Sequence, residues 1–394
     1  MAAACDRTLR VVIQFMHTSF LIIGAGPFGL AMAVQARELG IDHVLLGRPM
    51  SFWKKHIPER MMLRSGCKWH LDPTERDTIE RFLETRGQSP SDVEPLSLDF
   101  YLQYAEWFEQ VKGIRSRPCL VTRLEQSDGR FAATLDDDSI VTADRVLLAL
   151  GFASFAFIPD ELAEMVPADR SSHTCDCIAL EQFRGQRVLI VGGRQSAFEC
   201  AALLAEAGAA SVHVCHRHET PSFTASDWSW VDPLVERVGS EPGWYRGLSD
   251  AEREALNARF WAEGRRKLEP WLRPRVRRDV IAIRPRTRVI GCEQSTAALQ
   301  VRLDTGDTLE VDHVLYATGY KVNLRRVALL QAGNLLDRIE CRDGFPLLDN
   351  SLQTTVPGLF VTSLAAARDF GLFFAFTAAV RASARIVGRA IISS

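Results

Sequence analysis

The sequence lacks the features that mark several large classes of protein. It has nine cysteines in 394 residues, but no Cys-x-x-Cys pair and no zinc-ligand spacing, and the nearest two are Cys175 and Cys177. This pattern favours reduced thiols in a reducing compartment. Neither sign of charge predominates, since the formal net charge is only −2. Charge therefore gives no reason to expect nucleic acid or an anionic membrane as a partner.

Long hydrophobic runs are also absent, because no apolar stretch approaches the length of a membrane span. The first residues resemble a signal peptide, but their apolar part leads directly into a glycine-rich turn and has no cleavage site. We therefore expect residues 1–15 to be an appendage, the folded chain to begin near Met16, and the protein to be cytoplasmic. The length is enough for two domains of ordinary size.

One pattern is present twice. In the first copy, over residues 19–47, an apolar strand precedes a glycine-rich turn, a helix continues to Gly40, and a second apolar strand covers residues 42–46. The turn of this copy consists of Gly24, Ala25, Gly26, Pro27, Phe28 and Gly29. The order of strand, turn, helix and strand predicts a βαβ unit with parallel strands.

The second copy covers residues 188–217 and has the same order, with its helix ending near Gly208 and its last strand at residues 211–215. Its turn consists of Gly192, Gly193, Arg194, Gln195, Ser196 and Ala197. The ends of the two halves repeat as well: residues 130–152 and 298–320 each predict a hairpin followed by an apolar strand. These strands end in Ala149-Leu150-Gly151-Phe152 and in Ala317-Thr318-Gly319-Tyr320.

A single glycine turn is weak evidence, but two full units with matching ends predict two Rossmann-like dinucleotide-binding domains of the α/β class. In such a turn the first glycine allows the tight bend, the second lets the backbone approach the pyrophosphate, and the third lets helix and strand pack closely. Arg194 stands at the position of the middle glycine. Its guanidinium could clasp the pyrophosphate, or it could belong to a solvent-facing basic turn.

From Ser19 onward the chain resembles the class B flavoprotein monooxygenases, which include the flavin-containing monooxygenases, the Baeyer–Villiger enzymes and the amine N-hydroxylases. The resemblance rests on the two glycine turns and on the Ala-Thr-Gly-Tyr sequence near the end. Several stretches are most similar to the lysine and ornithine N-hydroxylases. These are Gln195-Ser196-Ala197 with Glu199, residues 51–65, residues 95–108 and the long segment 221–276.

The resemblance implies that the second domain is inserted in the first and carries a small helical insert. We expect residues 16–155 to form the first part of an FAD-binding domain and residues 156–310 to form an NAD(P)H-binding domain. The helical insert is expected at residues 221–276, where Ser249 and Glu252 have the spacing of a capping box. Residues 311–394 are expected to complete the FAD-binding domain.

The resemblance also implies the cofactors and the reaction. The first turn would hold FAD and the second NADPH, and reduced FAD would take up oxygen as a C4a-peroxyflavin that oxygenates a small molecule. Because the cofactor does this chemistry, no catalytic side chain and no metal are expected. Gln195 and Ser196, together with residues 317–320, would place the nicotinamide. Arg217 ends the second strand, where an arginine can meet the 2′-phosphate of NADP, so NADPH is favoured over NADH.

Further residues are expected near the flavin ring. The stretch from Arg368 to Phe374, with Asp369, Phe370 and Gly371 in it, would lie beside it, and Gly371 would permit close approach. Four residues of the segment after the first domain's second strand would line the pocket, namely Trp53, Arg64, Trp69 and His70. Core packing of the two tryptophans, and a hydrogen-bonded loop position for His70, stay open as alternatives.

The sequence departs from the family at two further places. The second strand of the first copy ends in Gly47 and Arg48, where an acidic residue usually takes the adenosine ribose. Arg48 could meet phosphate or adenine, or be a solvated charge. The Baeyer–Villiger motif before the second domain is represented only by His173, with Pro167 and Asp169 in place of its phenylalanine and glycine.

The substrate suggested by the resemblance is an amine, hydroxylated on nitrogen. The alternatives are oxygenation of sulfur, Baeyer–Villiger oxygenation, or an NAD(P)H oxidase or reductase that does not oxygenate. The tryptophans and arginines of residues 221–276 could bind a substrate carboxylate, although a helical surface or a subunit interface is the simpler interpretation. Molecular oxygen and a small molecule are the expected partners, without nucleic acid or membrane, and assembly into a homo-oligomer stays open.

Overall fold

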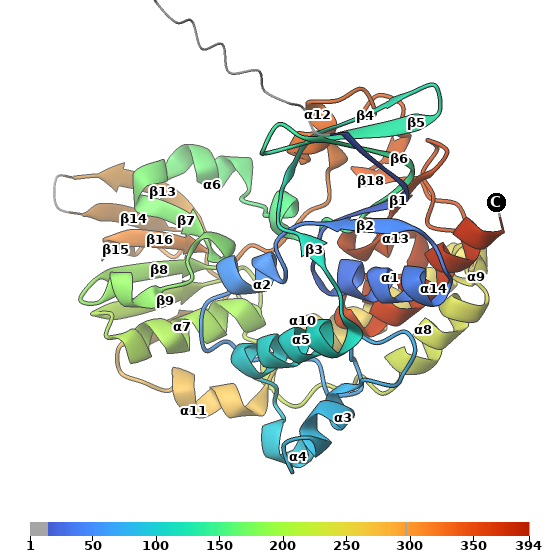
Figure 1. The fold of residues 1–394 in the computed structure, drawn as a ribbon. Helices are drawn as coiled ribbons and strands as arrows, with labels where there is room; N and C mark the ends of the chain where they lie inside the picture. The colour runs from blue at the N-terminus through green and yellow to red at the C-terminus, as the bar shows by residue number, and fades with distance from the viewer. Residues whose placement is uncertain (1–14, 296–297, 394) are drawn as a thin grey trace, which may run out of the picture.

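The structure is a computed structural model that describes residues 15–295 and 298–393. Nearly all of the predicted appendage lies outside these residues, and the first strand begins at Phe15. Two main sheets lie side by side with helices packed around them (Figure 1). The predicted α/β fold with two Rossmann-like halves is confirmed.

The first sheet has seven strands in the order β3-β2-β1-β6-β5-β4, with β19 paired to β6. Strands β1, β2, β6 and β19 are parallel, and β4 and β5 form an antiparallel edge. The strands are β1 Phe15–Ile23, β2 His43–Leu46, β3 Ser116–Arg117, β4 Val121–Ser127, β5 Arg130–Leu135, β6 Ile140–Leu148 and β19 Leu359–Val361.

The second sheet has five parallel strands in the order β12-β9-β8-β16-β7. They are β7 Ser171–His173, β8 Arg187–Val191, β9 Ser211–Cys215, β12 Ile281–Arg284 and β16 His313–Tyr316. A separate antiparallel sheet contains β13 Val289–Gln294, β14 Leu299–Leu303 and β15 Thr308–Val311. Two small pairs are β10 Ser222–Phe223 with β11 Lys267–Leu268, and β17 Cys341–Arg342 with β18 Phe345–Pro346.

The helices include α1 Pro27–Glu38 and α7 Gln195–Ala207, which connect β1 to β2 and β8 to β9 as the βαβ pattern predicts. The others are α2 Ser51–Lys55, α3 Ile79–Glu84, α4 Pro90–Val93, α5 Leu98–Lys112, α6 Asp160–Met165, α8 Val231–Ser240, α9 Trp244–Gly247, α10 Asp250–Arg265, α11 Arg273–Val276, α12 Ala328–Gln331, α13 Ala367–Phe370 and α14 Val380–Ile392. Among the described residues, every helix is too short or too polar to cross a membrane.

The repeated ends of the two halves adopt related but different structures. In the first half, β6 is one long strand that pairs with β5 at its start and with β1 along its length. In the second half the hairpin strand β15 stops at Val311, and β16 then enters the parallel sheet beside β8. By sheet membership the chain therefore returns to the first half after Tyr316, and the boundary predicted at residue 311 falls before a strand of the second half.

The helical insert predicted at residues 221–276 contains α8, α9, α10 and α11, and the capping box of Ser249 and Glu252 begins α10. The insert follows β9 of the second half in the chain, but most of it packs against the first half. Its residues Val231, Val235 and Phe260 belong to the core of the first sheet. Figure 1 shows α8 beside α14. The insert therefore bridges the two halves and closes one side of the space between them.

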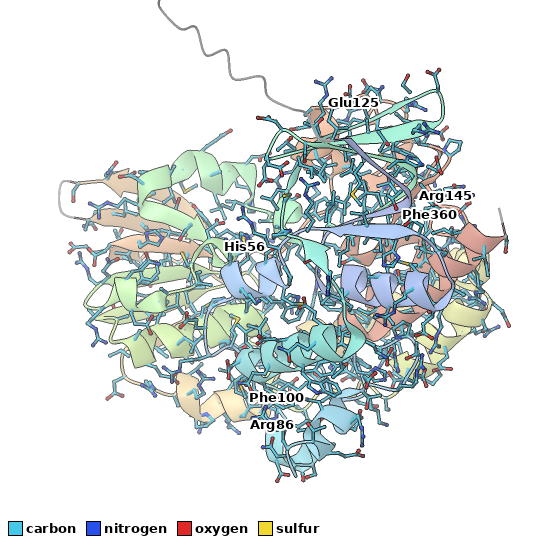
Figure 2. The ribbon with its side chains drawn as sticks, in the orientation of Figure 1. His56, Arg86, Phe100, Glu125, Arg145 and Phe360 are labelled. Carbon is cyan, nitrogen blue, oxygen red and sulfur yellow. The ribbon has the colours of Figure 1, made fainter. Side chains whose placement is uncertain are left out.

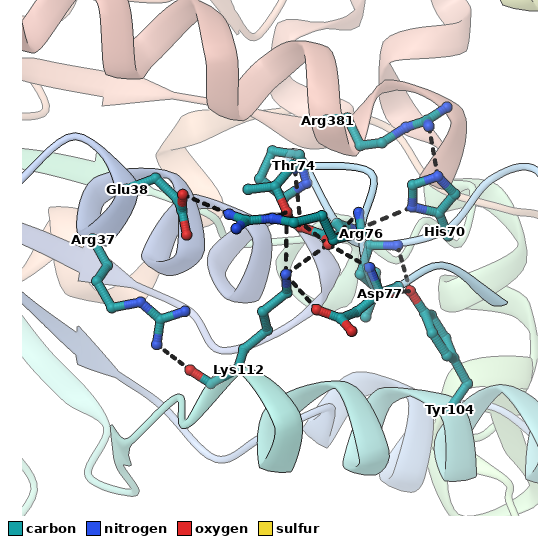
Figure 3. Close-up of polar contacts among 12 residues, drawn as sticks. Arg37, Glu38, His70, Thr74, Arg76, Asp77, Tyr104, Lys112 and Arg381 are labelled. Atoms are coloured by element: carbon teal, nitrogen blue, oxygen red, sulfur yellow. Dashed lines mark hydrogen bonds and ion pairs between the residues drawn. The ribbon is translucent and has the colours of Figure 1, made fainter. Parts of the chain in front are cut away.

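A buried ion network holds the loop between α2 and α3 against α5 (Figure 3). The Lys112 Nζ lies 2.7 Å from Asp72 Oδ2 and 2.6 Å from Asp77 Oδ2, and Asp72 is fully buried. Burial acts to raise the pKa of Asp72, but the Lys112 ammonium and backbone N–H groups outweigh it and lower the pKa to about 2. His70 adjoins this network, because its Nδ1 accepts the Asp72 N–H at 3.2 Å, and its Nε2 lies 2.7 Å from the Arg381 guanidinium.

Replacing Lys112 with methionine is expected to destabilise the fold by about 3–5 kcal/mol, because Asp72 would stay buried without its partner. The free energy of unfolding in urea measures the loss, and the exposed Lys68→Met serves as control. Equal stability of both variants would show that the network contributes little. Because the pKa of Asp72 is lowered from 3.8, its contribution in the wild-type protein is present above pH 3.8 and is lost as the pH falls toward 2.

Candidate active site

A cavity of about 1520 Å³ lies between the two halves, and both glycine turns open onto it. The repeated strand ends lie directly behind the turns. A Cβ on Gly24 would be 2.3 Å from the Ala149 carbonyl oxygen, and one on Gly192 would be 2.4 Å from the Ala317 carbonyl oxygen. Both glycines also have a positive φ, +112° and +148°. The contact explains why each glycine turn recurs with its own alanine-containing strand end.

The two remaining glycines of the first turn serve different purposes. A Cβ on Gly29 would meet the Gly24 carbonyl oxygen at 1.8 Å, so Gly29 is needed for close packing and does not line the cavity. A Cβ on Gly26 would meet nothing within 4 Å, and Gly26 lines the cavity. Helix α1 starts there without a side-chain cap and without an acidic residue in its first turn. The turn therefore offers free N–H groups and open space, which fit the pyrophosphate of a dinucleotide.

The second turn tolerates its arginine without strain. Arg194 is the N-cap of α7, with φ −114° and ψ −175°, an extended backbone that any residue adopts. Gly193 has a steric role, because a Cβ there would lie 2.4 Å from the Cβ of His216. The guanidinium of Arg194 lines the cavity and donates a hydrogen bond to the Arg265 carbonyl. The substitution in the glycine pattern therefore leaves the turn intact.

Arg194 and Arg265 place two unpaired positive charges beside this turn. Partial burial lowers the pKa of Arg194, and it lowers that of Arg265 to about 10, with repulsion by Arg194 as a second cause. Among the described residues neither guanidinium forms an ion pair with a carboxylate. Two neighbouring cations at the N-terminus of α7 are an arrangement suited to an anion.

The predicted residues at the ends of the second strands also reach the cavity. Arg217 lines it together with His216 and His218. His216 is buried, its Nε2 has no partner among the described residues, and burial lowers its pKa. In the first half, a Cβ on Gly47 would lie 2.9 Å from the Ala25 nitrogen, so this position excludes the acidic side chain of the family. The neighbouring Arg48 is half-exposed, lines the cavity and lies 3.7 Å from Asp136.

Three of the four residues expected around the flavin line the cavity, namely Trp53, Arg64 and Trp69. Arg64 is fully engaged, because its Nε lies 2.9 Å from Glu269 and a terminal nitrogen lies 2.7 Å from the Gly264 carbonyl oxygen. Through these bonds Arg64 connects the helical insert to the first half of the protein. Trp69 donates its indole N–H to Asp232, also in the insert, at 2.7 Å.

Two of the predicted placements fall outside the cavity lining. His70 is buried in the ion network described above and lies outside the cavity, because Arg381 of α14 holds its ring. Asp369, Phe370 and Gly371 also lie behind the cavity wall. The Asp369 carboxylate accepts a hydrogen bond from the Leu348 N–H at 2.9 Å, and Phe370 is fully buried. Gly371 has a φ of +99°, and Leu372 and Phe373 of the same predicted stretch line the cavity, as does Phe376.

Near the second turn, Gln195, Ser196 and all four residues of the strand end, Ala317, Thr318, Gly319 and Tyr320, line the cavity. Gln195 is also a structural link, since its Oε1 accepts a hydrogen bond from the Glu269 N–H at 3.1 Å. Glu199 one turn further on is a buried carboxyl in the same wall, and its Oε1 accepts from the Met62 N–H at 2.6 Å. These contacts join helix α7 to the cavity loop of the first half.

Glu199 gives the protein a specific pH dependence. Burial raises its pKa to about 7, from an ordinary value of 4.5, so the folded protein keeps a proton that the unfolded chain releases. The stability that this proton contributes is complete below pH 4.5 and is lost as the pH rises through 7. Glu199→Gln removes the titration, and we expect wild-type stability to fall by roughly 3 kcal/mol relative to the variant over this range. Thermal unfolding of both proteins against pH measures it, and parallel curves would contradict the prediction.

Two dinucleotide folds that open onto one shared cavity define a pyridine-nucleotide-linked oxidoreductase with two cofactor sites. The chain belongs to the pyridine nucleotide-disulphide oxidoreductase family, whose description matches residues 21–240 and, in a second family of the same description, residues 254–363. The described cysteines are all free, so the protein shares the fold of this family without a disulfide in the described residues.

Similarity to individual proteins is distant but extensive. The chain is 24% identical over 330 residues to the probable indole-3-pyruvate monooxygenase YUCCA9 of Arabidopsis thaliana, covering 77% of this chain and 75% of that one. It is 27% identical to the ferredoxin–NADP reductase of Paraburkholderia phymatum, over 54% of each chain. The ornithine N-hydroxylase of Kutzneria sp. 744 superposes with a TM-score of 0.76 at 16% identity, covering 96% of this chain and 99% of that one. The resemblance to class B flavoprotein monooxygenases is confirmed at the level of the fold.

Proposed function

We propose that the protein is an FAD-dependent, NADPH-consuming monooxygenase of small molecules, with hydroxylation of an amine nitrogen as the favoured reaction. The observation that carries the proposal is that two separate dinucleotide turns face a single cavity. This arrangement lets the reactive ends of two nucleotides meet. The fold shared with an ornithine N-hydroxylase, and the sequence similarity to an indole-3-pyruvate monooxygenase, support oxygenation over electron transfer alone.

The residues of the first half fit FAD. The open N-terminus of α1 at Gly26 would take the pyrophosphate, and Gly47 and Arg48 border the place of the adenosine. Trp53 and Trp69 supply ring surfaces toward the other end. When bound, FAD accepts a hydride from NADPH and activates molecular oxygen.

The residues of the second half fit NADPH. Arg194 and Arg265 would neutralise its pyrophosphate, and Arg217 stands where a 2′-phosphate is recognised. Gln195 and Tyr320 border the shared part of the cavity, where the nicotinamide would lie. The helical insert covers this part from the side and limits the access of water, which protects a reactive oxygen species from loss.

Baeyer–Villiger oxygenation is less well supported. In the structure His173 is buried, its Nε2 lies 3.0 Å from the Gly319 carbonyl oxygen and its Nδ1 lies 3.0 Å from Cys175 Sγ. Its role is therefore to hold the strand end with Tyr320, and it does not reach the cavity.

The test is anaerobic reduction of the FAD-loaded protein by NADPH, and separately by NADH, followed in the flavin absorbance. We expect rapid bleaching by NADPH. The reduced protein is then mixed with oxygen and an amine, and the products are separated. A hydroxylamine supports the proposal. A sulfoxide formed from a sulfide, or an ester formed from a ketone, would instead indicate oxygenation of sulfur or Baeyer–Villiger oxygenation. Hydrogen peroxide alone would indicate an oxidase, and absence of bleaching would overturn the proposal.

A further inference from the structure

A row of aromatic rings crosses the cavity from the second strand end to the helical insert. Tyr320 packs on Phe152 with ring centres 5.0 Å apart, and Phe152 lies 6.3 Å from Phe376. The row continues through Phe260, which is 5.7 Å from Phe376 and 5.3 Å from Trp228. Trp69 closes the row at 6.3 Å from Trp228, and all of these residues line the cavity.

The far end of this row belongs to neither glycine turn. It is built by the insert and by the segment after Gly371, and its members are Trp69, Trp228, Phe260 and Phe376, named below the aromatic wall. The first and second turns account for the two nucleotide arms of the cavity. The aromatic wall borders a third region, next to the point where the two arms meet.

Exposure within the wall indicates that it contacts a ligand. Phe376 keeps 44% of its surface exposed although it lines the cavity, which is unusual for so large an apolar side chain. Trp228 has a buried indole N–H without a partner among the described residues. Its ring is fixed in place by the Arg64 guanidinium 5.6 Å away and by Gly264, where a Cβ would approach the ring to 3.3 Å.

The charges around the wall restrict what it can bind. The carboxylates among the described cavity residues are Glu161 on α6 and Glu199 on α7, and neither belongs to the wall. The charged groups that contact the wall are the Asp232 carboxylate, which accepts the Trp69 indole N–H at 2.7 Å from outside the cavity lining, and the Arg64 guanidinium, 5.6 Å from the Trp228 ring. An ammonium group placed against the wall would lose its hydration without a carboxylate of the cavity lining to pair with, because Asp232 is already held by Trp69, and attraction to the ring faces would offset only part of that loss.

We propose that the aromatic wall binds an aromatic or arylalkyl group of the substrate, and that the substrate carries no second positive charge. The inference rests on the proposed function and narrows its substrate class. The reacting amine nitrogen must present its lone pair when it is oxygenated, so its ammonium proton passes to solvent before that step, and the other end of the molecule decides the preference between amines. An arylalkylamine places its aromatic ring against the wall, whereas an aliphatic diamine places its second ammonium group there.

The experiment titrates the oxidised, FAD-loaded protein with 2-phenylethylamine and with cadaverine by calorimetry, without NADPH. We expect 2-phenylethylamine to bind at least about tenfold more tightly, because ring contacts add to the burial of apolar surface. Phe376→Ala removes an exposed ring without opening the core. We expect this variant to bind 2-phenylethylamine about tenfold more weakly than the wild type. Trp228→Phe keeps the ring and tests the indole N–H. Val111→Ala, a similarly exposed residue outside the cavity at 48%, is the control.

Tighter binding of cadaverine, or an unchanged affinity of Phe376→Ala for 2-phenylethylamine, would overturn the inference. A variant that loses FAD but keeps amine binding would also overturn it, because the wall would then serve the flavin alone. Reduction of FAD by NADPH is measured on the same samples. Normal reduction with the wrong amine preference refutes only this inference, while absence of reduction refutes the proposed function.

Discussion

Gly26→Ala is expected to weaken FAD binding by about 10- to 100-fold while leaving the apoprotein as stable as the wild type. The backbone at Gly26 has φ −85° and ψ −170°, which alanine adopts freely, and its Cβ would meet no protein atom within 4 Å. The added methyl group therefore costs the fold nothing. It projects into the space where the turn approaches the pyrophosphate, and the loss appears only when the cofactor binds.

Gly247→Ala provides the matched control. Gly247 also has nothing within 4 Å of its would-be Cβ and lies outside the cavity, at the end of α9. Affinity for FAD is measured by fluorescence quenching on apoprotein refilled with the cofactor, and thermal unfolding of the apoproteins reports the fold. If Gly26→Ala binds FAD as tightly as Gly247→Ala does, the first turn does not hold the pyrophosphate.

The sequence predicts the two cofactor turns because their requirements are local. A glycine with positive φ, followed by a helix without a cap, can be identified from the order of residues alone. The strand end that each turn contacts is harder to predict from the local sequence pattern. Only the repetition of the two strand ends indicated it. The structure supplies the physical cause, a contact of Gly24 with Ala149 and of Gly192 with Ala317.

The positions of His70 and of residues 369–371 outside the cavity lining have a common origin. Nearness in sequence to a cavity residue does not fix the direction of a side chain. Trp69 faces the cavity while its neighbour His70 turns to Arg381, a residue that is distant in the chain. Similarly, Ala367 and Leu372 line the cavity, whereas residues 369–371 between them do not.

Glu199 was named only as part of the resemblance, without a role, and the aromatic wall was not predicted. Glu199 follows Gln195 by four residues, which places both on one face of α7, and this spacing could have revealed the pair. The wall could not be predicted, because it joins Trp69, Trp228, Phe260 and Phe376 from three distant segments. Its existence depends on the helical insert packing against the first half, which its sequence position in the second half does not indicate.

Arg194→Gly restores the glycine that the pattern lacks, yet we expect it to weaken NADP⁺ binding by about 10- to 100-fold. The reason is electrostatic: Arg194 and Arg265 lack carboxylate partners among the described residues, and partial burial lowers the pKa of both. An anion between them would be held by charge-assisted hydrogen bonds, each of which contributes about 1.5–3 kcal/mol. Removing one arginine also relieves the repulsion on the other. The double variant Arg194→Gly/Arg265→Ala should therefore lose less NADP⁺ binding free energy than the sum of the losses in the two single variants.

Calorimetric titration of the oxidised, FAD-loaded protein with NADP⁺ measures these losses, with Arg325→Ala, an exposed arginine outside the cavity, as control. Two interpretations of Arg194 predict opposite changes in NADP⁺ affinity for Arg194→Gly. If the arginine clasps the pyrophosphate, Arg194→Gly binds more weakly and the affinity depends less on salt. If the arginine obstructs the turn, the same variant binds NADP⁺ more tightly than the wild type. Because the backbone at Arg194 is unstrained and its side chain already turns toward the Arg265 carbonyl, the structure favours the clasp.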